Sequence, residues 1–308
     1  MMTDQLAATS VPTRCGFVAL IGAPNVGKST LVNALVGSKV TIVSKKVQTT
    51  RALIRGIVIE NNAQIILVDT PGIFAPKRRL DRAMVSTAWS GAHDADLVCL
   101  LLDAREGIDE EADAIFTKLA TVNHPKILVI NKIDLVPRER LLKLTAKANE
   151  RLDFTQTFMV SAMSGDGVDD LRRALAAAVP EGPFHYPEDQ MSDAPLRHLA
   201  AEITREKIYR HLHQELPYQS TVETDSWTER NDKSVRIEQT IFVERDSQRK
   251  IVLGKAGATI KSIGSDSRKE IAEIVGQPVH LFLFVKVRDG WGDDPERYRE
   301  MGLEFPKE

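Results

Sequence analysis

Cysteine is scarce in this 308-residue sequence, which has only Cys15 and Cys99, each inside an apolar run. This excludes a disulfide framework, and we interpret both as small buried hydrophobic residues of a reduced, cytosolic chain. An excess of one charge is also missing, because 41 basic residues balance 43 acidic ones to a net charge of −2. Any nucleic-acid-binding surface must therefore be local.

Long hydrophobic runs are absent as well. No apolar stretch reaches the ~18 residues of a membrane-spanning helix. Residues 1–13 lack the basic and apolar regions of a secretion signal, so we expect a flexible N-terminal tail. The remaining composition, 43% hydrophobic and 27% charged, is that of a globular protein. The length predicts two domains, at about 100–200 residues per domain.

Between residues 14 and 180, apolar runs alternate with stretches whose apolar residues recur every three or four positions. The runs predict strands at 16–21, 65–69, 96–103, 126–131 and 158–161, with a further strand near 54. The periodic stretches predict helices at 28–37, 80–89, 109–121, 137–152 and 168–178. This alternation indicates an α/β domain around a mainly parallel sheet that is buried on both faces.

A proline-bearing linker is predicted at 181–195, where both kinds of periodicity stop. Beyond it the pattern differs. It predicts a helix at 196–215, strands at 220–228 and 234–243, a helix at 258–275 and a strand at 280–287. The order α-β-β-α-β indicates a separate α+β domain over 196–308, including a C-terminal tail.

The most specific motif is the loop G-x-x-x-x-G-K-[ST] at 22–29, which follows a predicted strand and begins a predicted helix. In this context the backbone N–H groups surround phosphate oxygens, Lys28 neutralises the β- and γ-phosphates, and the Ser29 hydroxyl ligates Mg²⁺. The predicted phosphate-loop residues are Gly22, Ala23, Pro24, Asn25, Val26, Gly27, Lys28, Ser29 and Thr30. The loop occurs once, which excludes a tandem of two such domains.

Asn25 has two interpretations of equal weight. Its carbonyl oxygen can face a potassium ion beside the phosphates, or the residue can be present for its backbone conformation in a turn.

A second motif, Asp69-Thr70-Pro71-Gly72, ends the strand at 65–69. The Asp69 carboxylate can hold Mg²⁺ directly or through water, and the Gly72 N–H can reach a γ-phosphate. Ile73 follows, where Ras-like proteins carry the glutamine that orients the attacking water. An apolar side chain cannot do this, so we expect slow intrinsic hydrolysis. A threonine of the segment 48–51, for which we favour Thr50, can complete the Mg²⁺ ligands.

Asn131-Lys132-Ile133-Asp134 follows the strand at 126–131 and predicts the base. The Asp134 carboxylate can accept hydrogen bonds from N1–H and the 2-amino group of guanine. Adenine has neither donor there, and binding it would leave the carboxylate unpaired at a cost of ~1–3 kcal/mol or more. Ser161 and Ala162, after the last predicted strand, fit a loop that closes over the base. The predicted ligands are therefore GTP and GDP.

The C-terminal domain contains a G-x-x-G turn, Gly254-Lys255-Ala256-Gly257. Such a turn is typical of KH modules, which clamp about four nucleotides, although an ordinary turn at the start of a helix has the same pattern. Residues 245–288 include nine basic and four acidic residues, so a basic patch is present inside a neutral total. Lys261 and Arg268 belong to this patch, and Trp291 can stack on a base or pack against the domain.

Together these motifs resemble the Era family of bacterial GTPases. They are GAPNVGKST at 22–30, QTTR at 48–51, DTPG at 69–72, NKID at 131–134 and SA at 161–162, with further similar stretches at 215–218, 243–245, 254–257, 285–287 and 290–291. The resemblance runs from about residue 13 onward. It implies a P-loop NTPase of the Ras-like type at 14–180, followed by a type II KH domain at 196–308.

The resemblance also implies GTP hydrolysis, binding of 16S rRNA near its 3′ end, and a role in maturing the small (30S) ribosomal subunit. Within it we expect Lys28, Thr50 and Gly72 to act in hydrolysis, with Ser29, Thr50 and Asp69 as metal ligands. We expect a cytoplasmic monomer, and the family is also found peripherally on the inner membrane.

Two alternatives fit part of the pattern. An RNA-binding module with a merely structural nucleotide site is disfavoured by the intact Lys28, Ser29, Thr50 and Asp69. A related GTPase acting on tRNA would need a catalytic cysteine in its C-terminal part, and no cysteine follows Cys99.

Overall fold

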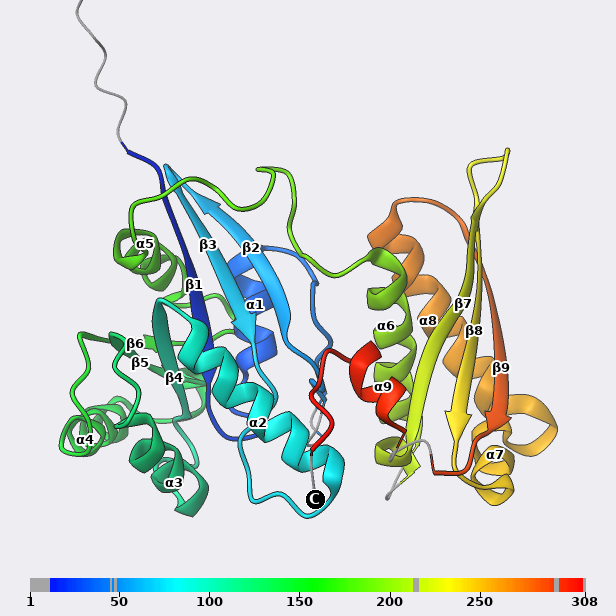
Figure 1. Cartoon of the computed structure of the whole chain (residues 1–308), viewed down its shortest axis with the longest axis horizontal. Coiled ribbons are helices and arrows are strands. Elements are labelled where there is room, and N and C mark those ends of the chain that lie inside the picture. Colours follow the sequence, from blue (N-terminus) through cyan, green and yellow to red (C-terminus); the bar gives the residue numbers. More distant parts are fainter. Residues whose placement is uncertain (1–11, 45, 47–48, 213–215, 291–293, 307–308) are drawn as a thin grey trace, which may run out of the picture.

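A computed structural model describes residues 12–44, 46, 49–212, 216–290 and 294–306. Gln48, Trp291 and residues 1–11 of the expected tail lie outside the described residues. Figure 1 shows two domains side by side, connected by the segment between helices α5 and α6. No helix in the described ranges combines the length and apolarity that crossing a membrane requires.

The first domain is built on a six-stranded sheet with the order β2-β3-β1-β4-β5-β6. Strand β2 is antiparallel to β3, and the other neighbours are parallel. The strands are β1 (Arg14–Ile21), β2 (Ile54–Glu60), β3 (Ala63–Asp69), β4 (Leu97–Asp103), β5 (Lys126–Asn131) and β6 (Gln156–Val160). The mainly parallel sheet predicted from the apolar runs is thus confirmed.

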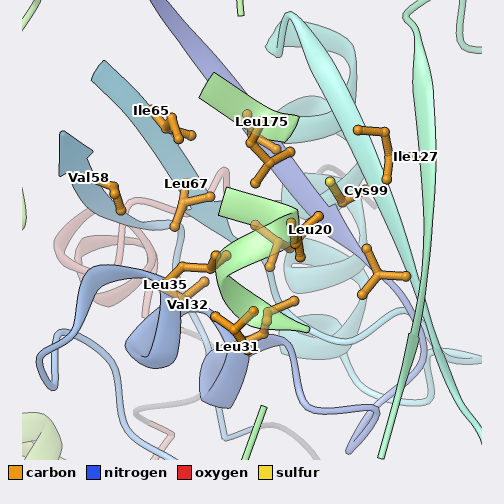
Figure 2. Close-up of a cluster of buried hydrophobic side chains, with 14 of the residues drawn as sticks. Leu20, Leu31, Val32, Leu35, Val58, Ile65, Leu67, Cys99, Ile127 and Leu175 are labelled. Atoms are coloured by element: carbon orange, nitrogen blue, oxygen red, sulfur yellow. The ribbon is translucent and has the colours of Figure 1, made fainter. Parts of the chain in front are cut away.

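Five helices cover the two faces of this sheet: α1 (Lys28–Val36), α2 (Arg79–Asp94), α3 (Glu110–Leu119), α4 (Arg138–Asn149) and α5 (Val168–Ala178). Helices α1 and α5 lie on one face, where Leu31 and Leu175 meet Leu20 and Leu67 of the sheet (Figure 2). Helices α2, α3 and α4 enclose the core on the other face. Cys15 and Cys99 are free and buried, as predicted.

The second domain has a three-stranded sheet, β7-β8-β9, with β7 antiparallel and β9 parallel to β8. Its elements are α6 (Leu196–His211), η2 (Leu216–Gln219), β7 (Ser220–Glu229), β8 (Val235–Val243), α7 (Asp246–Leu253), η3 (Lys255–Gly257), α8 (Ala258–Val275), β9 (Val279–Val287) and α9 (Pro295–Glu300). Residues 213–215 of the first predicted helix lie outside the described residues.

The predicted order α-β-β-α-β is wrong by one helix, because α7 precedes the G-x-x-G turn. Only Val252 of this eight-residue helix is buried, and Ile251 is exposed, so the sequence carries too little periodicity to show it. The start of the helix is capped instead by Gln248, whose Oε1 accepts from the N–H groups of Glu244 at 2.9 Å and Arg245 at 3.1 Å. The corrected order, α-β-β-α-α-β, is that of a type II KH domain.

The strand order determines where the motifs meet. Strands β1, β3, β5 and β6 are parallel, so their carboxyl ends lie at one edge of the sheet. The four predicted nucleotide motifs begin at the last residue of these strands or directly after it. This edge is the place where ligands bind to open α/β sheets.

A candidate guanine nucleotide site in contact with a KH domain

The phosphate loop connects β1 to α1 in a conformation that its residue types explain. Asn25 and Gly27 have φ angles of 62° and 100°, and a Cβ atom on Gly27 would lie 2.3 Å from Nδ2 of Asn131. Glycine at position 27 therefore avoids both backbone strain and a clash. The positive φ of Asn25 matches the turn interpretation, while the potassium site stays a prediction. Thr30 follows in the first turn of α1.

Lys28 lies at the centre of this loop. Its Nζ atom donates hydrogen bonds to the carbonyl oxygens of Gly22, at 2.9 Å, and Ala23, at 3.0 Å. Burial lowers the pKa of Lys28 to about 8, and Asp69 partly offsets this effect. A bound phosphate would raise the pKa again, because it supplies the counter-charge that the buried ammonium lacks.

The three predicted metal ligands converge on one point. The Ser29 hydroxyl donates to Asp69 Oδ2 at 2.7 Å and lies 2.9 Å from the hydroxyl of Thr50, which is 3.3 Å from Oδ2. Asp69 is fully buried, and this burial raises its pKa although the hydroxyl groups oppose the shift. Its other oxygen, Oδ1, is buried and accepts no hydrogen bond from any described residue.

This oxygen set fits magnesium. Mg²⁺ prefers hard oxygen ligands, usually one or two carboxylates together with waters and substrate phosphates. The unpartnered Asp69 Oδ1 and the hydroxyls of Ser29 and Thr50 are such ligands. When bound, the ion would neutralise phosphate charge at the reacting group.

The motif 69–72 lies against the phosphate loop. A Cβ atom on Gly72 would be 2.9 Å from the Cα of Pro24, and the Ile73 N–H donates to the Gly22 carbonyl at 3.1 Å. The hydroxyl of Thr70 donates to the carbonyl of Leu20 at 2.6 Å. The side chain of Ile73 is buried in the core, so it orients no water by hydrogen bonding.

The base-reading motif is tied to its neighbours by Asn131. The Asn131 amide donates to the Val26 carbonyl at 2.9 Å, and its Oδ1 accepts from the Ala162 N–H at 3.0 Å. One side chain thereby connects the phosphate loop with the loop that contains Ser161 and Ala162. Ile133 and Asp134 lie on the short helix η1 (Ile133–Leu135), where Asp134 is exposed and can reach a base.

Asp103 is a member of this site that the sequence did not reveal. Lys132 has a φ of 64°, and its ammonium donates to the Asn25 carbonyl at 2.5 Å and to Asp103 at 2.6 Å. Burial favours a raised pKa for Asp103, but hydrogen bonds from Arg105 and Lys132 outweigh it and lower the pKa. The only hint in the sequence was its position at the end of an apolar run.

The arginine next to Thr50 enters the KH domain. The Arg51 guanidinium donates to the carbonyl oxygens of Ser220 at 2.9 Å, Tyr218 at 3.2 Å and Pro217 at 3.3 Å, and to the Tyr209 hydroxyl at 3.2 Å. Arg51 is 4% exposed. The segment that contains the predicted metal ligand Thr50 is thus anchored in the neighbouring domain by the following residue.

Ion pairs reinforce this contact. Lys39, just after α1, pairs with Glu206 on α6 and with Glu270 on α8. The side chain of Glu206 is 1% exposed, and Lys207 also pairs with Glu270. Arg205 on α6 donates to the carbonyl of Thr49. The contact thus includes charged groups whose burial needs every partner in place.

Ile42 of the first domain belongs to the apolar core of the second. It is fully buried in one cluster with Leu199, Ala200, Ile203, Val235, Ile237, Ile271 and Val279. Residues 39–51 therefore contact the KH domain through apolar packing as well as polar groups. We call residues 39–51 the connecting segment; positions 45, 47 and 48 in it are not described.

Helix α2, which follows the Gly72 loop, makes a second contact with the C-terminal part. The buried residues of this contact are Leu80, Ala83, Met84, Tyr298 and Leu303. The guanidinium of Arg79 lies over the ring of Phe305, 5.0 Å from its centroid. Figure 1 shows the chain after α9 running to α2. Both segments that flank the γ-phosphate position thus reach the second domain.

The G-x-x-G turn lies between α7 and α8. Gly254 and Gly257 have φ angles of 72° and 77°, and a Cβ atom on Gly254 would lie 2.2 Å from Oγ1 of Thr259. Ala256 also has a positive φ, 50°. Lys255 is exposed at the turn, and the predicted RNA-binding residues Lys261 and Arg268 are exposed along α8. Their contact with RNA stays a prediction.

The fold and the geometry of its loops define a P-loop GTP-binding domain joined to a KH domain. Comparison with known proteins agrees: a family model described as 50S ribosome-binding GTPase matches residues 17–132, and a KH domain model matches residues 215–292. The chain is 86% identical over 297 residues to GTPase Era of Afipia carboxidovorans, covering 96% of each chain. It is 84% identical over 308 residues to GTPase Era of Bradyrhizobium diazoefficiens, covering all of both.

Solved structures are also similar. Era from Aquifex aeolicus bound to GDP and AlF₄⁻ has a TM-score of 0.89 at 38% identity, covering 94% of this chain and 99% of that one. Era in complex with MgGDPNP and nucleotides 1506–1542 of 16S ribosomal RNA gives the same values. The chain belongs to the Era family of GTPases, and it is an enzyme that hydrolyses GTP.

Proposed function

We propose that this chain is a GTP-dependent switch that binds 16S rRNA near its 3′ end and acts in assembly of the 30S ribosomal subunit. The similar Era structure with nucleotides 1506–1542 of 16S rRNA supports the choice of RNA. The observation that carries the switch is the connecting segment, in which Thr50 contacts Asp69 while Arg51 is held by KH carbonyl groups.

The coupling follows from the adjacency of these two residues. Thr50 can contact metal only when the segment lies against Asp69, and Arg51 makes its hydrogen bonds from the same backbone position. Release of the γ-phosphate removes one of the contacts that would hold the connecting segment against Asp69. A displacement of Thr50 would therefore displace Arg51 and weaken its hydrogen bonds to the KH domain.

The residues of the site favour GTP hydrolysis but leave its intrinsic rate low. Lys28 supplies positive charge at the phosphates, and the Gly72 backbone lies close to the phosphate loop. Ile73 leaves the attacking water without a side-chain hydrogen bond at this position. We infer that a partner or backbone groups orient that water, so that the intrinsic rate is low. Single-turnover hydrolysis by Ile73→Gln, compared with the parent chain, tests this.

Three further proposals follow from the sequence. Potassium binds beside Asn25, which is tested by comparing hydrolysis in potassium and sodium chloride, with Asn25→Gly as the variant. The chain is cytoplasmic with a peripheral fraction on the inner membrane, which cell fractionation measures. It acts as a monomer, which light scattering checks.

The target is tested by crosslinking the purified chain to cellular RNA with GTP or GDP bound, and mapping the sites. We expect enrichment at the 3′ end of small-subunit rRNA and a difference between the two nucleotides. Enrichment on tRNA would overturn the proposal in favour of a tRNA-directed GTPase. Equal maps with GTP and GDP would leave an RNA-binding module without a switch.

The KH turn is tested by replacing Lys255 and Ala256 with aspartate. The two carboxylates repel a phosphate backbone, while Gly254 and Gly257 keep the turn. Binding of a single-stranded oligonucleotide of the rRNA 3′ end should weaken strongly, with a salt slope lower by about one unit. A matched control places aspartates at Ala146 and Lys147, exposed on α4; it should bind like the parent.

A further inference from the structure

Thr41 is a buried residue of the nucleotide site that no motif includes. It lies eight residues before the Thr49-Thr50 pair, in the run Val40–Val43, and its exposed fraction is 0%. Its hydroxyl donates to Asp69 Oδ2 at 2.9 Å. A buried hydroxyl is stable only when hydrogen-bonded, and here its described acceptor is the carboxylate that faces the metal position.

Thr41 is itself held in place by α1. The Asn33 amide donates to the Thr41 carbonyl at 2.8 Å, and Asn33 Oδ1 accepts from the N–H groups of Val40, at 2.9 Å, and Thr41, at 3.1 Å. These bonds fix the backbone on both sides of the Thr41 Cα atom. The hydroxyl is therefore directed at Asp69 by the phosphate-loop helix, independently of Thr50.

The described hydrogen bonds to the Asp69 carboxylate reach only one of its two oxygens. Oδ2 accepts from Ser29, Thr41 and Thr50, whereas Oδ1 accepts from no described residue. Ser29 and Thr50 are expected to turn their hydroxyl oxygens to the ion when it binds. Among the described side chains, Thr41 would then be the one that still restrains Oδ2.

We propose that Thr41 is a positioning residue of the nucleotide site: by holding Oδ2 of Asp69, it fixes the orientation of the carboxylate that contacts the magnesium ion or one of its waters. This inference depends on the nucleotide site alone and not on the ribosomal function. Hydrogen bonds that orient a metal-binding carboxylate typically change metal affinity or activity by about 10–100-fold when they are removed.

The test uses full-length Thr41→Val, which keeps the shape and deletes the hydroxyl. The measured quantity is the dissociation rate of a fluorescent GDP analogue across a series of Mg²⁺ concentrations, with an EDTA arm. We expect the Mg²⁺ concentration that half-maximally retains the nucleotide to rise by about tenfold. In EDTA the parent and variant should release GDP at the same rate, because the ion contributes nothing there.

Two further variants keep the result interpretable. Thr41→Ser should restore the parent Mg²⁺ dependence, because it returns the hydroxyl. The control Thr145→Val removes a hydroxyl on α4 that donates to the Leu141 carbonyl rather than to Asp69, and it should leave the Mg²⁺ dependence unchanged. An unshifted Mg²⁺ midpoint for Thr41→Val overturns the proposal. So does faster release in EDTA together with failure of Thr41→Ser to restore the midpoint.

Discussion

The nucleotide-binding domain touches the C-terminal part of the chain in two places that differ in chemistry. The connecting segment combines the packing of Ile42 with hydrogen bonds and ion pairs, with Arg51 on backbone carbonyls and Lys39 between two glutamates. Helix α2 makes an apolar and aromatic contact, with Met84 fully buried beside Tyr298 and Leu303. The first contact thus depends on directional hydrogen bonds and ion pairs in addition to apolar packing, whereas the second depends on apolar packing and one cation–π contact.

This difference indicates different mechanical properties. Hydrogen bonds weaken steeply when their angle becomes poor, and leaving a buried partner unpaired is costly. Apolar contacts tolerate small shifts at little cost because their stabilisation follows buried area. We therefore expect the connecting segment to respond in an all-or-none manner and α2 to adjust gradually while the domains remain together.

The largest expected effect comes from removing the nucleotide's influence on both contacts. Lys28→Ala deletes the buried positive charge at the phosphates, and GTP affinity should fall by about 100-fold, or about 3 kcal/mol. Hydrogen exchange should then show the same protection in the connecting segment and in α2 with or without GTP. The control is Lys143→Ala, an exposed lysine on α4; it should keep the nucleotide-dependent difference.

Arg51→Ala should disrupt the polar contact alone. It leaves several buried carbonyl groups and the Tyr209 hydroxyl without this donor, and we expect a loss of about 2–3 kcal/mol in the free energy of unfolding. Urea denaturation measures this loss. Exchange should accelerate in η2 and the start of β7 but not in α2. Arg173→Ala, an exposed arginine on α5, is the control; equal destabilisation by both variants would contradict the assigned role.

Leu303→Ala should loosen the apolar contact. The side chain is 4% exposed, and truncating a buried leucine costs about 2 kcal/mol or more, here at the low end because a C-terminal segment can readjust. The effect of Leu303→Ala on the free energy of unfolding should be the same at low and high salt. The effect of Lys39→Met should be smaller at high salt, because salt screens the ion pairs that Lys39 makes. Leu142→Ala, exposed on α4, should have no effect. A salt-dependent loss for Leu303→Ala would contradict the comparison.

The smallest effect is expected for Phe305→Leu. The substitution keeps apolar contact but removes the ring beneath the Arg79 guanidinium, a cation–π interaction of about 0.5–1 kcal/mol at a partly exposed site. Thermal denaturation of Phe305→Leu and Phe305→Tyr should show a loss only for the first. If both variants are equally stable, or both lose the same amount, the ring contributes through packing alone.

Much of the nucleotide site could be predicted from the sequence because phosphate, Mg²⁺ and guanine each require particular residue types at a particular spacing. Lys28, Ser29 and Asp69 stand in motifs that phosphate and metal require, and buried strands placed those motifs at one edge of the sheet. The guanine preference predicted for Asp134 likewise follows from the donors on the base. The sequence favours Thr50 as the Mg²⁺ ligand, and the structure shows its hydroxyl beside Asp69.

What the tertiary structure decided is how those residues are supported and to what they are connected. Thr41, Asn33 and Asp103 belong to no motif; they contribute because folding brings them to Asp69 and Lys132. Helix α7 was missed because it buries one side chain and is stabilised by its cap. The contact of Arg51 with the KH domain involves residues more than 150 positions away. Local spacing determines periodicity and ligand chemistry, whereas contacts between distant segments exist only once both domains have folded and met.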